Sequence, residues 1–186
     1  MKTKQMRWLC MLVGLTFSLT LAARTPLASQ NSCQAVNDAK DKVMTVPAHI
    51  YNEMAPVFNN GVKPRPNDIH RAETIYLGAS AFTKLRGKWE RSQWTAQRVI
   101  KQEQENRQTG NFSCRYLGDE AVNGERAAVY STHSERDNVK SDGQIWISKS
   151  RGLPLRHEFD VEMTNGVTSK NHVSTRYEYS NVQTPM

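Results

Sequence analysis

The stretch QIWISKSRGLPLRHEFDVEM, residues 144–163, decides the fold of this chain. From Leu155 to Met163, four apolar side chains and His157 alternate with four charged ones. A strand has a side-chain period of two, so this pattern predicts a strand with one dry face and one wet face. The Arg-Gly pair at 151–152 predicts a turn back to the strand before it, because glycine accepts a positive φ.

Similar strands and turns fill the chain after residue 111. Asn123-Gly124 is a strong hairpin signal, and residues 173–180 alternate in the same way as 155–163. Asp142-Gly143 is interpreted as leading into the strand around Trp146, and Asn165-Gly166 as a further turn. Earlier strands are expected at 48–57, 69–77 and 81–89. Short helices are expected at 34–46 and 95–107 from the spacing of their apolar residues. The fold class predicted is α+β, a curved antiparallel sheet (half β-barrel) with short helices covering its concave face.

The first 23 residues have the organisation of a signal peptide. Lys2, Lys4 and Arg7 precede an apolar run that ends in Ala22-Ala23, near which we predict cleavage. The run is too short to span a bilayer, and no cysteine follows it closely enough for a lipid anchor. We therefore expect a periplasmic protein with a flexible leader at 24–32 and a single domain at 33–183.

The charge of the predicted mature chain is modest. Cleavage of the signal peptide would remove three of the 25 lysines and arginines. The mature chain would then have 22 basic and 18 acidic residues. No Lys/Arg run remains, which argues against nucleic-acid binding. Cys33 and Cys114 are the two cysteines left, and an even pair in an exported chain predicts a disulfide. Neither has a second ligand at metal-binding spacing, so no metal is expected.

Catalytic motifs are absent from the sequence. There is no Gly-x-Ser-x-Gly elbow, phosphate loop or dinucleotide fingerprint, so no cofactor and no enzymatic activity are predicted. His157 lies on the apolar side of its strand, where it is either a satisfied core histidine or a base in a pocket. We predict that the dry face lines a cavity for an elongated apolar ligand; the alternative is that the helices pack tightly on this face and leave no cavity. The residues proposed to line that cavity are Val129, Ile145, Ile147, Leu155, His157, Phe159, Val161, Met163 and Tyr177.

Several segments resemble the sheet of LolA/LolB-like periplasmic proteins. They are residues 120–130 (EAVNGERAAVY), 144–148 (QIWIS), 152–156 (GLPLR), 176–182 (RYEYSNV) and, earlier, 87–91 (GKWER). The resemblance covers roughly residues 46–182. It implies an open half-barrel with a helical lid and a hydrophobic cavity for the acyl chains of lipids or lipoproteins.

The function expected is therefore that of a periplasmic, monomeric binding protein. It would hold an acyl chain or another apolar ligand, and could take part in lipid or lipoprotein handling with envelope proteins. Two alternatives remain open: a secreted hydrolase that uses a pocket histidine, and an envelope interaction or sensor module without a small ligand.

Overall fold

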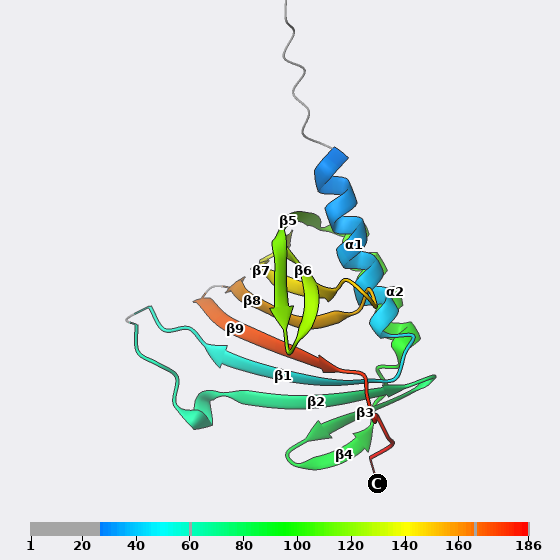
Figure 1. The fold of residues 1–186 in the computed structure, drawn as a ribbon. Coiled ribbons are helices and arrows are strands. Elements are labelled where there is room, and N and C mark those ends of the chain that lie inside the picture. The colour runs from blue at the N-terminus through cyan, green and yellow to red at the C-terminus, as the bar shows by residue number, and fades with distance from the viewer. Residues whose placement is uncertain (1–26, 60, 166, 186) are drawn as a thin grey trace, which may run out of the picture.

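The computed structural model describes residues 27–59, 61–165 and 167–185 of the 186-residue chain. The predicted signal peptide at 1–23 and Gly166, with which a further turn was predicted, lie outside the described residues. A single antiparallel sheet organises the rest (Figure 1), which confirms the predicted α+β class. Its strands are β1 Ala48–Pro56, β2 His70–Leu77, β3 Ser80–Leu85, β4 Lys88–Arg91, β5 Asn111–Val122, β6 Glu125–Arg136, β7 Val139–Ser148, β8 Pro154–Asn165 and β9 Val167–Glu178.

Two meanders build this sheet. Its strand order is β4-β3-β2-β1-β9-β8-β7-β6-β5, so every neighbour in space is also a neighbour in sequence except β1 and β9. That long-range pair runs from His49 opposite Glu178 to Pro56 opposite Asn171. It joins the two meanders into one curved sheet whose described edges are β4 and β5.

Two helices cover one face of the sheet. These are α1 Leu27–Val43 and α2 Ala96–Thr109, and a 3-10 turn (η1, Pro66–Asp68) lies before β2. We call the face under the helices the inner face and the opposite one the outer face. Val36 and Ala39 of α1 pack on Cys114, Ile145 and Ile147, and all five are buried.

A second set of contacts joins both helices to the half of the inner face that β1 to β3 form. Val43 and Ala96 pack with Ile50, Tyr76 and other buried residues of β1 to β3. Thr95 caps α2, because its hydroxyl accepts from the backbone N–H of Arg98. Both helices were predicted, but α1 begins earlier than residue 34 and therefore includes part of the expected leader.

The turns follow the sequence signals with one exception. Asn123 and Gly124 both have positive φ, as the predicted hairpin requires, and Gly152 has φ +63° after β7. Gly143 does not lead into a strand but lies in the middle of β7, opposite Phe159 of β8. A Cβ there would lie 2.2 Å from the carbonyl oxygen of Glu158, so glycine permits the close approach of β7 and β8.

The predicted disulfide is present. Cys33 in α1 is bonded to Cys114 in β5, across 81 residues of sequence. It attaches the N-terminal helix to an edge strand of the sheet, which holds α1 over the inner face.

Candidate functional site

The space between the helices and the inner face contains two adjoining chambers. One, the β1-side chamber, has a volume of about 290 Å³ and lies between the helices and strands β1, β2, β8 and β9. The other, the β7-side chamber, has about 330 Å³ and reaches the start of β5 and strands β6 to β8. Each volume is near the lower end of the usual range for ligand pockets, about 300–1,000 Å³. The inner face is therefore not filled completely by the helices.

Four side chains line both chambers and form the boundary between them. His157 and Phe159 rise from β8, and their rings stack with centroids 4.4 Å apart. Lys40 comes from α1 and Glu103 from α2. The same boundary thus carries two aromatic rings from the sheet and two ionisable groups from the helices.

The structure brings four of the nine predicted cavity residues to the chambers. His157 and Phe159 line both, Val161 lines the β7-side chamber, and Tyr177 lines the β1-side chamber. Strict alternation along β8 and its register with β9 explain this grouping, because these side chains all project from the inner face.

The remaining predicted residues lie elsewhere. Ile145 and Ile147 are on the inner face but buried directly beneath α1. Met163 is half-buried and paired with Val139 near the far end of β8. The described residues that line the two chambers do not include these three.

Two of the predicted residues belong to the outer face. Val129 is opposite Trp146 in the β6–β7 ladder, and both pack with Leu155 in a separate cluster. Leu155 was expected beside His157, but the register of β7 and β8 shifts between Trp146 and Ile147. This irregularity breaks the period of two at the start of β8, so Leu155 turns away from the chambers.

Sequence reasoning missed the polar part of the site, which belongs to α1. Lys40 is four residues after Val36 and Asn37 is three before Lys40, so both lie along the edge of the buried stripe of the helix. Asn37 lines the β7-side chamber, and its Oδ1 is buried without a hydrogen-bond partner. The spacing of Lys40 beside the apolar stripe of α1 was the sequence signal that could have indicated an amine facing the sheet.

Burial governs the electrostatics of the boundary. It lowers the pKa of Lys40, and the Glu103 carboxylate opposes that shift. Burial, with the positive charge of Lys40 as a second cause, lowers the pKa of His157 to about 3. Burial raises the pKa of Tyr177. His157 and Tyr177 are therefore neutral at physiological pH.

An ion pair holds the two helices together at this level. Arg107 of α2 donates to both carboxylate oxygens of Asp41 of α1, at 2.7 and 3.0 Å. The pair is part-buried and bidentate, the geometry in which such bonds are strongest. Arg107 and Asp41 thus satisfy one another, whereas Lys40 has no hydrogen bond or ion pair of 4 Å or less among the described residues.

A row of Ser113, His133 and Asp142 crosses β5, β6 and β7 in register. His133 Nδ1 lies 2.7 Å from Asp142 Oδ1, and the row lines a broad hollow of about 690 Å³. Within the described part of the chain no hydrogen bond joins Ser113 to His133, and the Asp142 side chain is 57% exposed. The row consequently lacks the activated hydroxyl and the water-excluded setting of a nucleophilic triad.

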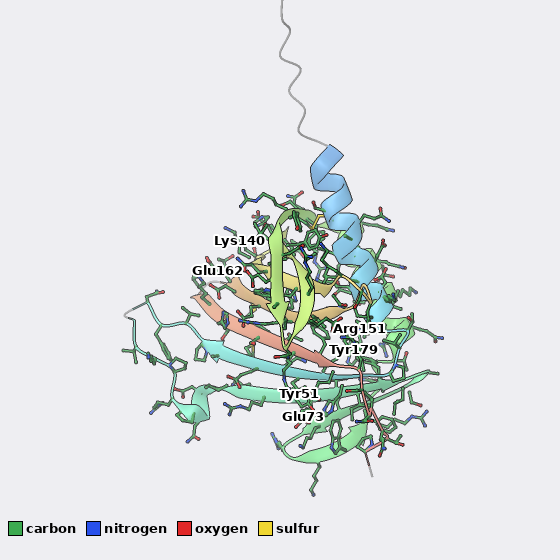
Figure 2. The ribbon with its side chains drawn as sticks, viewed as in Figure 1. Tyr51, Glu73, Lys140, Arg151, Glu162 and Tyr179 are labelled. Atoms are coloured by element: carbon green, nitrogen blue, oxygen red, sulfur yellow. A yellow bond between two sulfur atoms is a disulfide. The ribbon has the colours of Figure 1, made fainter. Side chains whose placement is uncertain are left out.

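Another cluster fastens the end of β9 to the turn after β7. Figure 2 shows Arg151 and Tyr179 beside each other; the guanidinium lies 5.1 Å from the ring centroid. Arg151 also binds Glu125, and with Ser148 and Ser150 it lowers the pKa of that carboxyl to about 2. Lys42 of α1 donates to the carbonyl oxygen of Arg151 at 2.5 Å. The cluster fixes the C-terminal end of α1 to the sheet.

Two further properties concern the described residues as a whole. They include no group of three His, Cys, Asp or Glu side chains arranged to hold a metal ion. No helix among them has the length and apolar character needed to cross a membrane.

Comparison with known proteins gives low similarity throughout. No protein-family model matches the sequence, and no curated protein matches it. Among solved structures, LprF from Mycobacterium bovis has a TM-score of 0.42 at 9% identity over 86% of this chain and 98% of LprF. MucB, in a complex with MucA(peri), has a TM-score of 0.36 at 13% identity over 83% of this chain and 60% of MucB. A DUF1329 family protein from Desulfovibrio piger has a TM-score of 0.32 at 10% identity over 84% and 95% of the two chains. No functional conclusion follows from similarities at these TM-scores.

Proposed function

We propose that this protein is an exported, non-catalytic binding protein that holds one acyl chain, from a lipid or a lipoprotein, between its helices and the inner face of its sheet. The observation that carries the proposal is the pair of adjoining chambers, which meet at Phe159 and His157. In this proposal the acyl chain lies along the shared wall and extends from one chamber into the other.

The chemistry of the β1-side chamber supports an apolar occupant. Five apolar side chains from the two helices, the residue after α1 and β1 line it: Val43, Met44, Ile50, Val99 and Ile100. Val99 and Ile100 of α2 are only half-buried although they line the space between this helix and the sheet. A hydrocarbon placed against them would leave water at a gain of about 0.8 kcal/mol per methylene.

Export to the periplasm is proposed on two grounds. The first 23 residues have the sequence of a signal peptide. The Cys33–Cys114 disulfide is typical of a protein that folds in an oxidising compartment.

The hydrolase alternative is less well supported by the site. A histidine whose pKa is about 3 is a weak base at neutral pH, and His157 stacks on Phe159 instead of contacting a nucleophile. A screen of ester substrates with wild type and His157→Ala separates the two functions. Hydrolysis that disappears in the variant would favour catalysis over binding.

The binding proposal is tested by filling the cavity. Ile100→Trp adds bulk to the β1-side chamber, and we expect it to weaken binding of a fluorescent fatty acid about tenfold or more. Leu85→Trp adds the same side chain at an outlying position that is 53% exposed, and it should bind as wild type does. Native mass spectrometry of freshly purified protein should also show a co-purifying lipid. Absence of saturable binding and of any bound lipid would refute the proposal.

A further inference from the structure

We infer that Lys40 and Asn37 form a headgroup site in the β7-side chamber, and that the ligand is a single-chain amphiphile with an anionic headgroup. The inference rests on the proposed function, because it assigns an orientation and a charge to the same bound chain. The acid group would lie against α1 in the β7-side chamber, and the chain would extend past Phe159 into the β1-side chamber.

Lys40 is the cationic group that would bind the anion. Its side chain lines both chambers, its Nζ lies 5.8 Å from the centroid of the Phe112 ring, and among the described residues it has no hydrogen bond or ion pair of 4 Å or less. Removing an ammonium group from water without a paired carboxylate is costly. A ligand carboxylate or phosphate at Nζ would supply the missing charge-assisted hydrogen bond.

Asn37 provides a second, independent polar group at the same place. It lies one helical turn before Lys40 and lines the β7-side chamber. Its Oδ1 is buried and accepts no hydrogen bond. A buried amide oxygen without a donor is rare, and a headgroup in this chamber would satisfy the carboxamide, either by donating to Oδ1 or, after the amide rotates, by accepting from Nδ2.

The two chambers differ in the character of their walls, which sets the orientation. Asn37, with its unsatisfied Oδ1, lines the β7-side chamber and not the β1-side chamber. The β1-side chamber instead has the apolar wall described above. Arg107 of the β7-side chamber and Asp41 of the β1-side chamber neutralise one another and favour neither orientation. An acid headgroup is therefore favoured at the β7 side, and the hydrocarbon at the β1 side.

Glu103 allows the role of Lys40 to be tested with charge changes of opposite sign. Its carboxylate faces Lys40 and interacts with it electrostatically, but at more than ion-pair distance. If Lys40 and Glu103 interacted with each other and with no ligand, removing either charge would change the affinity for every ligand equally. If Lys40 binds a headgroup, Glu103 repels that headgroup and its removal should strengthen binding of an acid.

The test compares three ligands of equal chain length, lauric acid, lauryl alcohol and laurylamine, as competitors of the uncharged dye N-phenylnaphthylamine. Wild type should bind the acid about tenfold or more tightly than the alcohol, and the amine most weakly. Lys40→Met should remove that preference, and Glu103→Gln should increase it. Lys101→Met is the matched control on α2, since the Lys101 side chain is 79% exposed and its loss changes the net charge equally. Urea denaturation of each variant verifies that it is folded.

The outcomes separate the headgroup site from the chain site. Equal affinity for acid and alcohol in wild type, or the same result from Lys40→Met and Lys101→Met, would overturn the headgroup site and leave acyl-chain binding intact. No displacement of the dye by any of the three would overturn both.

Discussion

Replacing His157 with glutamine should make the protein less sensitive to acid. His157 is 9% exposed, and burial lowers its pKa from the ordinary 6.5 to about 3. In the unfolded chain the imidazole regains its ordinary pKa and binds a proton that the folded state excludes. Stability is therefore fully present above the unfolded pKa and is lost as the pH falls from about 6.5 towards about 3.

The magnitude follows from the two pKa values. Each unit of pKa difference corresponds to about 1.4 kcal/mol. Between about pH 7 and about pH 4.5, protonation of His157 in the unfolded state should cost wild type about 2.5 kcal/mol of unfolding free energy. The window stops near pH 4.5 because Asp119 and Glu125, whose pKa values are lowered to about 2, lose their own stabilisation at lower pH.

The assay is urea denaturation followed by tryptophan fluorescence, on lipid-free protein with its disulfide intact. His157→Gln cannot titrate, so the difference between variant and wild type isolates this histidine from the other groups that face the chambers, Lys40, Glu103 and Tyr177. We expect the free-energy curve of the variant to be flatter by about 1 kcal/mol per pH unit over this range. Parallel curves for the two proteins would show that His157 is hydrated or protonated in the folded state, and would refute the reasoning.

Two further predictions concern the scaffold. Replacing both Cys33 and Cys114 with alanine should lower the unfolding free energy by about 4–5 kcal/mol, because the disulfide closes a long loop in the unfolded chain; an unchanged urea midpoint would contradict this. Gly143→Ala should destabilise the protein by about 3 kcal/mol or more, since the new Cβ would lie 2.2 Å from a carbonyl oxygen of β8. A thermal midpoint equal to that of wild type would show that β7 and β8 can separate without cost.

Local patterns in the sequence determined the sheet. Alternation from Leu155 to Met163 and the positive-φ pair Asn123-Gly124 predicted antiparallel strands, because side-chain direction and turn geometry depend on near neighbours in the chain. The disulfide could also be predicted, since Cys33 and Cys114 are the two cysteines that remain once the predicted signal peptide is removed.

Only the tertiary structure decided which apolar residues face the cavity. A strand shows two faces, but its sequence does not say which neighbour's face lies beneath a helix. Val129 pairs with Trp146 on the outer face, and a register shift turns Leu155 the same way. The half-buried polar residues Asn37 and Lys40 could not be assigned to the site from α1 alone, because their surroundings depend on the distant strands and on α2, which fold around them. The register of β1 against β9, more than 100 residues apart, sets that enclosure, and such long-range pairing leaves no local signal in the sequence.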